Sequence, residues 1–165
     1  MVSIILMMDE DRLSALTRFE RKYRCTPAEY FAIKNALYPY IQEDLFTHKA
    51  PNHKYLVRSL YFDTSHYRIF FEKHGGNSER VKYRIRTYST LVEDDPDIRV
   101  EMKVREANLT WKYGSYTTLD DCQNFLSNRH WKNGDDPVLQ EFERRIHLYN
   151  LLPKTLVEYH REGYQ

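Results

Sequence analysis

The sequence predicts an α+β domain rich in antiparallel β-sheet, and three observations support this fold class. Aromatic residues make up 15% of the 165 residues and include 14 tyrosines, and half-buried strands accommodate such side chains well. Six segments have the alternating pattern of a strand, and helix-start signals occur between them. With 41% hydrophobic and 30% charged residues, the chain is neither disordered nor of low complexity, so one domain around one core is expected.

The expected strands alternate apolar and polar side chains, as strands with one buried face do. The pattern is clearest where Ile98, Val100 and Met102 alternate with charged residues. A short turn after Arg105 is expected to make a hairpin with the strand that follows. The six strands are expected at residues 17–24, 55–62, 80–88, 98–105, 109–116 and 155–164.

Two helices are expected in the first half of the chain. The first begins at Thr26–Glu29, which combines an N-cap, a first-turn proline and a capping-box acid, and ends at Pro39. The second covers Ser65–His74, with Thr64 as its cap and a glycine pair at its end. Asp63, just before it, is open to two interpretations: a turn and helix-capping residue, or a catalytic acid.

Two further helices are expected near the end of the chain. One starts at Thr118 and runs toward Asn128. The other starts at Pro137, carries an apolar stripe at helical spacing, and is expected to end at Pro153. No internal repeat and no interdomain linker separate these elements.

Overall charge excludes several functions. Lys and Arg number 25 against 24 Asp and Glu, so no global field steers this chain to nucleic acid or to an acidic membrane. Cys25 and Cys122 lie too far apart for a CxxC or zinc motif, which favours a reducing cytosol. The apolar run Val2–Met8 is too short to span a membrane. We therefore expect a cytoplasmic protein with no membrane segment and no nucleic-acid partner.

One strand face carries an unusual charge pattern. Residues 80–88 place four cations and no acid on one face, and these cations repel one another unless an anion lies between them. Glu101 and Lys103 share a face of the next strand, as do Glu20 and Lys22 on the first. A phosphate site bridged by Mg²⁺ or Mn²⁺ would use such pairs. An antiparallel sheet with one solvated face remains the alternative.

Several motifs resemble VTC domains, the polyphosphate polymerase domains of the vacuolar transporter chaperone family in the CYTH and triphosphate tunnel metalloenzyme superfamily. They occur in the same order as in those domains and, with the terminal Tyr159–Tyr164 segment, extend the resemblance over residues 17–165. The motifs are Phe19-Glu20-Arg21-Lys22-Tyr23, Val57-Arg58-Ser59-Leu60-Tyr61-Phe62-Asp63-Thr64, Lys82-Tyr83-Arg84-Ile85-Arg86 and Val100-Glu101-Met102-Lys103.

The resemblance implies an antiparallel β-barrel tunnel with peripheral helices, a basic inner wall, and a site for ATP and a polyphosphate chain with Mn²⁺ or Mg²⁺. In this interpretation residues 1–16 are an N-terminal extension, residues 17–165 form the tunnel domain, and a terminal phosphate attacks the γ-phosphate of ATP. It implies catalytic roles for Lys22, Arg84, Arg86, Lys103 and Arg161, weaker phosphate-binding roles for Arg58, Lys82 and Lys112, and metal-binding roles for Glu20 and Glu101.

The chain departs from the family pattern at three places. Arg18 stands where the superfamily often has the first glutamate of a Glu-x-Glu-x-Lys motif, which disfavours the triphosphatase branch. Gly114 stands where an arginine is common. Six expected strands against eight in the family barrel lead us to expect an incomplete tunnel. A triphosphate hydrolase, a non-catalytic polyphosphate- or triphosphate-binding module, and a nucleic-acid-binding sheet remain as alternatives.

Overall fold

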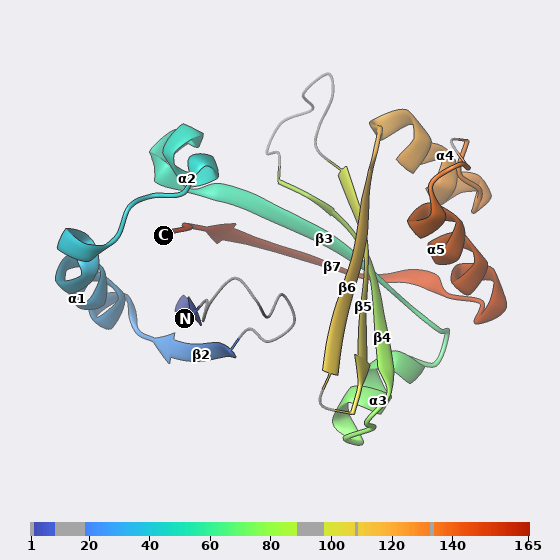
Figure 1. Cartoon of the computed structure of the whole chain (residues 1–165), viewed down its shortest axis with the longest axis horizontal. Helices are drawn as coiled ribbons and strands as arrows, with labels where there is room; N and C mark the ends of the chain where they lie inside the picture. Colours follow the sequence, from blue (N-terminus) through green and yellow to red (C-terminus); the bar gives the residue numbers. More distant parts are fainter. Residues whose placement is uncertain (1, 9–18, 89–97, 108, 133) are drawn as a thin grey trace. The chain divides into compact units, whose positions relative to one another are not determined.

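The computed structural model describes residues 2–8, 19–88, 98–107, 109–132 and 134–165, with side chains from residue 21 onward (Figure 1). The chain has the expected α+β composition and divides into two compact units. The first unit contains residues 1–49 and 162–165, and the second contains residues 50–161. Arg18 and the acidic connection at residues 93–97 lie outside the described residues.

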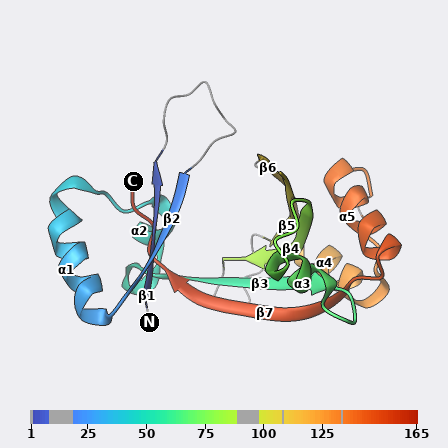
Figure 2. The ribbon, with the colours of Figure 1, turned by 90° about the horizontal axis from the view of Figure 1, so that it is seen from below.

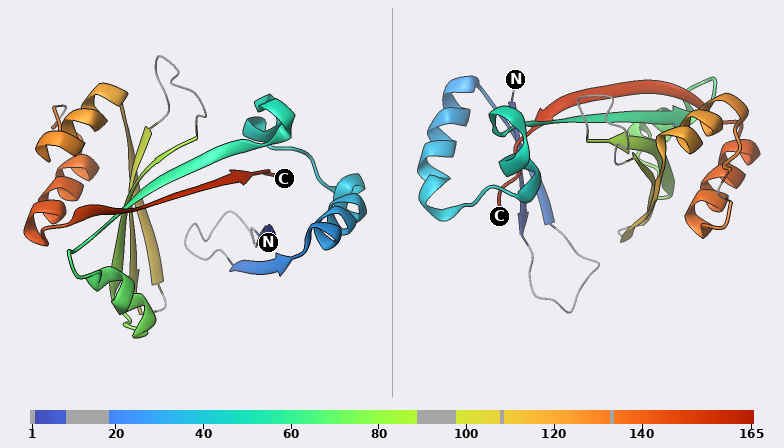
Figure 3. Two further views of the ribbon diagram at one scale, coloured as in Figure 1. Left: turned by 180° about the vertical axis from the view of Figure 1, so that it is seen from behind. Right: turned by 90° about the horizontal axis from the view of Figure 1, so that it is seen from above.

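A five-stranded antiparallel sheet forms the second unit, with strand order β6-β5-β4-β3-β7. The long strands β3 and β7 run side by side in both views of Figure 3. All five strands were expected from the sequence, although β7 begins and ends three residues earlier than predicted. The strands are β3 (Tyr55–Asp63), β4 (Arg80–Thr87), β5 (Ile98–Glu106), β6 (Leu109–Thr117) and β7 (Leu152–Arg161).

This sheet is open at β6 and at β7, which form its two edges. Within the described part of the chain, neither edge strand pairs with a further strand. Closing a sheet into a barrel requires its two edge strands to meet. The structure therefore confirms the expected antiparallel sheet that is not closed into a barrel.

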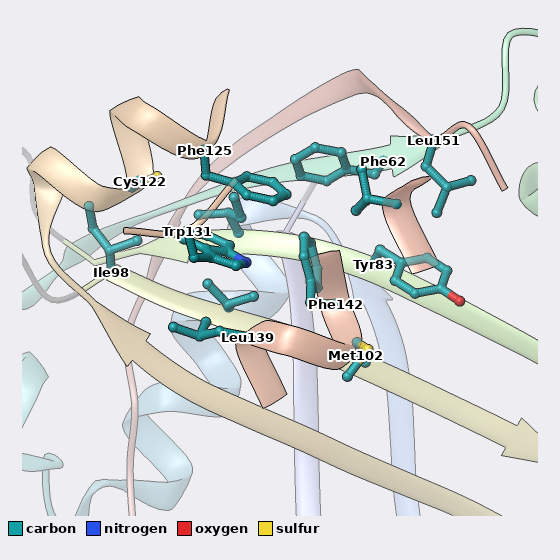
Figure 4. Close-up of a cluster of buried hydrophobic side chains, with 13 residues drawn as sticks. Phe62, Tyr83, Ile98, Met102, Cys122, Phe125, Trp131, Leu139, Phe142 and Leu151 are labelled. Atoms are coloured by element: carbon teal, nitrogen blue, oxygen red, sulfur yellow. The ribbon is translucent and has the colours of Figure 1, made fainter. Parts of the chain in front are cut away.

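Two helices, α4 (Leu119–Asn128) and α5 (Pro137–Leu148), cover one face of β4–β6 (Figures 1 and 2). The hydrophobic core lies between them and the sheet (Figure 4). Phe142 is fully buried at its centre, where its ring meets those of Phe62, Tyr83, Phe125 and Trp131 at centroid separations of 5.6 to 6.3 Å. Strand alternation turns the other face of the sheet away from this core.

Helix starts follow the sequence signals with one exception. Thr118 caps α4 through the N–H of Asp121, as expected. The helix α3 (Arg68–His74) begins three residues later than predicted, after Tyr67 in the left-handed region (φ 57°). The reason is Asp63, whose carboxylate accepts the N–H groups of Ile69 and Phe70 as well as that of Thr64. Asp63 is therefore a turn and helix-capping residue, one of its two proposed roles.

The remaining helix predictions are met within a few residues. The first expected helix is α1 (Pro27–Leu37), which continues as the 3₁₀ helix η1 (Tyr38–Tyr40). Thr26 and Glu29 form its capping box. The last helix, α5, ends at Leu148, five residues before the proline expected to end it, and Asn150 then adopts a positive φ of 46°.

The first unit contains two elements that the sequence patterns missed. The strand β1 (Val2–Met8) pairs antiparallel with β2 (Phe19–Cys25), and no strand was expected in residues 1–16. Its run of consecutive apolar residues lacks the alternation by which strands were sought. The short helix α2 (Leu45–Lys49) and the 3₁₀ helix η2 (Pro51–His53), which begins the second unit, were also not expected.

Residues 162–165 belong to this first unit. Glu162 accepts hydrogen bonds from Tyr30 (2.6 Å) and Lys34 (2.9 Å) of α1. Gly163 donates its N–H to Thr47 Oγ1 at 2.6 Å, and a Cβ at this position would overlap the Asp44 carboxylate. The predicted last strand therefore ends at Arg161, and side-chain and backbone hydrogen bonds hold the four residues after it to the first unit.

Cys25 and Cys122 are both buried, and they form no disulfide with each other. Among the described helices, none is both long enough and apolar enough to cross a membrane.

We predict that Phe142→Ala lowers the free energy of unfolding by about 3–5 kcal/mol, because a fully buried ring leaves a cavity. Phe71, which is 62% exposed on α3, provides a matched control. Phe71→Ala should change the free energy of unfolding by less than about 1 kcal/mol in the same urea titration. Equal effects of the two substitutions would contradict the core assignment.

A second prediction concerns the thiol of Cys122. Burial, with a smaller contribution from the Asp121 carboxylate, raises the pKa of Cys122 from 9.0 to about 11. The thiolate is the reactive form, and this higher pKa lowers the amount of thiolate at pH 8 about a hundredfold. In a Cys25→Ser variant, iodoacetamide should label the folded protein at least that much more slowly than the urea-unfolded protein. Equal labelling rates would show that the packing of α4 is wrong.

Candidate functional site

The face of the sheet opposite the helices carries most of the expected site residues. In β4 and β5 they alternate with core residues such as Tyr83, Ile85 and Val100, and the cross-strand register brings them together. β6 contributes a residue through its pairing with β5. We call this set the basic face: Lys82, Arg84 and Arg86 on β4, Arg99, Glu101 and Lys103 on β5, and Lys112 on β6.

Glu101 lies at the centre of the basic face and is 1% exposed. Its Oε2 accepts a 2.5 Å hydrogen bond from Arg84 Nε, and its Oε1 lies 2.6 Å from Lys112 Nζ. Arg99 Nε lies 3.5 Å from Oε1. One carboxylate thus has three cations around it.

These cations determine the protonation of Glu101. Burial alone would raise the pKa of its carboxyl group, but the hydrogen bond from Lys112 and the charge of Arg84 outweigh burial and lower the pKa below its ordinary value. Glu101 is therefore ionised at neutral pH. Its single negative charge leaves the surrounding cluster with a positive excess.

Arg86 is a buried cation held by neutral groups. It is 9% exposed, and its Nε donates to Ser59 Oγ at 2.9 Å while Nη1 donates to Tyr88 OH at 3.4 Å. No carboxylate of the described residues forms an ion pair with it. Burying a charge is costly unless an opposite charge accompanies it, so this position favours an anionic ligand.

Three lysines form a row across the basic face. Lys103 on β5 is directly opposite Lys82 on β4 and directly opposite Lys112 on β6. Side chains in such pairs start about 5 Å apart and repel when their charges are alike. Lys112 contacts the Glu101 carboxylate, and the row brings three positive charges to neighbouring positions of the sheet.

The outer strands place two other candidates on opposite faces. Arg161 on β7 pairs with Tyr55, lies on the same face as Ser59, and has its guanidinium 6.0 Å from the Tyr55 ring centroid. Arg58 alternates with Ser59 and therefore lies on the other face, where it forms an ion pair with Glu158. The register thus brings Arg161, but not Arg58, to the side of the sheet that carries the basic face.

Two candidates belong to the first unit. Lys22 is an exposed residue of β2. Glu20 lies on the same strand, and its side chain is outside the described residues. Their part in a site with Arg84, Arg86 and Lys103 stays a prediction.

A divalent cation finds few ligands among the described residues. No group of three or more Asp, Glu, His or Cys side chains that could hold a metal occurs in this part of the chain. Glu101 is the one acid of the basic face; its Oε2 accepts from Arg84, and its Oε1 is in ion-pair contact with Lys112. Mg²⁺ is usually held by one or two carboxylates together with waters and substrate phosphates. The described residues therefore do not fit a metal bound by protein groups alone.

Arg99 was missed by sequence reasoning, although the alternation that selected Lys103 placed it on the same strand face. Its guanidinium lies 5.4 Å from the Tyr116 ring centroid and close to Gly114. The sequence could have identified Arg99 by this alternation alone. Its proximity to Gly114 required the pairing of β5 with β6.

Comparisons with known proteins agree with this geometry. The model of the VTC domain family matches residues 17–165. A crystal structure from Bacillus halodurans, of a protein provisionally described as an adenylate cyclase, matches with a TM-score of 0.52 and 14% sequence identity. The match covers 84% of this chain and 61% of that one. No curated protein sequence matches the chain.

The structural match shows that the two chains share a fold. The family match covers nearly the whole chain, including every residue of the basic face. The chain belongs to the VTC domain family.

Proposed function

We propose that the basic face binds the phosphate chain of a triphosphate or polyphosphate. The observation that carries this proposal is Arg86, a buried guanidinium whose hydrogen-bond partners among the described residues are the hydroxyl groups of Ser59 and Tyr88. A phosphate chain supplies closely spaced negative charges, which a row of cations on one strand face can match. Arginine contributes planar paired donors to such oxygens, and lysine contributes a point charge.

The proposed reaction is phosphoryl transfer from ATP to polyphosphate, as in the polymerases that this family is known for. A terminal phosphate oxygen of the chain forms a bond to the γ-phosphorus of ATP, the bond between that phosphorus and the β,γ-bridging oxygen breaks, and ADP leaves with the electron pair. Arg84 and Arg86 would neutralise charge on the transferring oxygens, and Lys82, Lys103 and Lys112 would hold the rest of the chain.

Metal dependence is part of the proposal in a restricted form. Because the described residues do not fit a metal held by protein groups alone, Mg²⁺ or Mn²⁺ would arrive already bound to the phosphates. The basic face then contacts the phosphate oxygens that the metal leaves free. Glu101 orients Arg84 and Lys112 in this proposal.

The activity can be tested by product analysis. The protein is incubated with ATP, a short polyphosphate primer and Mg²⁺ or Mn²⁺, and polymer and free phosphate are separated on a gel. Metal-dependent growth of the primer with release of ADP supports the polymerase. Free phosphate alone would indicate the hydrolase, and binding without turnover would indicate a binding module. Competition by RNA with a steep salt dependence would favour the nucleic-acid alternative.

We predict that Arg86→Met weakens binding of inorganic tripolyphosphate by about 1.5–3 kcal/mol, the contribution of a charge-assisted contact. The same substitution should leave the free energy of unfolding unchanged or raise it, because it removes a buried charge that forms no ion pair with a carboxylate of the described part of the chain. Calorimetric titration measures the binding, and urea unfolding measures the stability.

Two arginines provide controls for this prediction. Arg144 on α5 is 57% exposed and forms an ion pair with Glu141, and Arg58 lies on the opposite face of the sheet. Arg144→Met and Arg58→Met remove the same charge, and both should bind tripolyphosphate within about threefold of the parent. If Arg86→Met binds as tightly as the parent, the basic face is not the site.

A further prediction concerns Glu101→Gln. Losing the buried charge that Arg84 and Lys112 hold should lower the free energy of unfolding at pH 7 by about 1–3 kcal/mol. Its pKa in the folded protein is lowered from 4.5, so the parent has this stability at neutral pH and loses it as pH falls through the lowered value. The difference between parent and variant should therefore shrink below pH 4.5, as measured by urea unfolding from pH 7 to pH 3.

Glu158→Gln is the control for this substitution, because Glu158 is 43% exposed in its ion pair with Arg58. It should change stability by less than about 1 kcal/mol. Mg²⁺ without phosphate should not raise the melting temperature of the parent or of Glu101→Gln. Stabilisation of the parent alone would show that Glu101 binds the metal directly.

A further inference from the structure

The guanidinium of Arg99 lies against Gly114, where a Cβ would crowd it. In the register of β5 and β6, Arg99 is opposite Tyr116 and Glu101 is opposite Gly114, so Arg99 reaches Gly114 diagonally. A Cβ at position 114 would lie 3.1 Å from Arg99 Nε and 3.4 Å from Nη2. The first distance is tighter than ordinary van der Waals contact, so a side chain there would push the guanidinium away.

Arg99 also keeps hydrogen-bonding capacity. Its Nε is buried and has no hydrogen-bond partner within the described residues. The nearest carboxylate oxygen, Glu101 Oε1, is 3.5 Å away, which is too far for a good hydrogen bond. The Tyr116 ring, 5.4 Å from the guanidinium carbon, supports it by a cation–π contact.

The charges around Glu101 single out Arg99 among its three neighbours. Arg84 and Lys112 contact the carboxylate at 2.5 and 2.6 Å, whereas Arg99 is about 1 Å further away. One carboxylate balances one cation, so the cluster has a net excess of positive charge. Arg99 is the least neutralised of the three and is 30% exposed, so an incoming anion can reach it.

Resting on the proposed function, we propose that Arg99 is a phosphate-binding residue of the basic face and that Gly114 provides the space for its guanidinium. The ligand class is a chain of at least three phosphates, and inorganic tripolyphosphate is its smallest probe. Arg99 supplies a guanidinium from β5, beside position 114 of β6, where the glycine has no side chain. An arginine at position 114 could then replace it, because that residue would extend over the same part of the basic face.

The test relocates the charge between the two strands. Arg99→Ala should weaken tripolyphosphate binding about tenfold or more, because a charge-assisted contact is lost. In the double variant Arg99→Ala/Gly114→Arg, affinity should return to within about threefold of the parent. Arg144→Ala, on α5 and away from the basic face, is the matched control: its guanidinium forms an ion pair with Glu141, and we expect less than a threefold change.

Thermal unfolding of each variant separates loss of binding from loss of the fold. If Arg99→Ala does not fold, Arg99→Gln keeps the stem and part of the hydrogen bonding, and it should show the same loss of affinity. Parent-like binding by Arg99→Ala or Arg99→Gln, while Arg86→Met still weakens binding, would overturn this inference and leave the proposed function standing. A double variant that binds tripolyphosphate as weakly as Arg99→Ala would also overturn this inference. A parent protein that does not bind tripolyphosphate would overturn both.

Discussion

Repulsion between like charges on neighbouring strands is the constraint on which the basic face depends. The backbone ladder fixes the spacing of Lys82, Lys103 and Lys112, and the side chains cannot all move apart. Burial of the opposite face, where Phe142 and its aromatic neighbours pack, favours this arrangement and offsets the repulsion. Glu101 relieves part of the repulsion from inside the cluster. What is left is a surface organised for an anion before the anion arrives.

Sequence patterns were sufficient for elements whose local signals agree with their packing. Alternation located all five strands of the large sheet, and the capping box at Thr26 located the start of α1. The patterns failed where an element lacks such a signal. β1 is a continuous apolar run without alternation, and α2 has only five residues, too few for a helical period. The late start of α3 depended on Asp63, whose helix-capping bonds reach up to seven residues ahead.

The candidate site was predictable up to the pairing of strands. Alternation assigns a side chain to one of two faces of its own strand, which is why Arg84, Arg86 and Lys103 were found. It does not say which face of the next strand joins them. Arg58 was proposed by family position, and the register places it with Glu158 on the other face. Gly114 looked like a missing cation in the sequence, and its diagonal proximity to Arg99 could not be inferred without the pairing of β5 and β6.

The basic face also concentrates positive charge in one part of the protein. The whole chain has a formal net charge of +1, while the six cations and one carboxylate of this face have a net charge of +5. All other residues together must therefore be net negative, at −4. A polyanion is therefore attracted to one face of the sheet although the chain as a whole is nearly neutral. The isoelectric point of 7.8 does not reveal this local excess of positive charge. Retention on an ion exchanger therefore depends on which face of the protein adsorbs more than on its total charge.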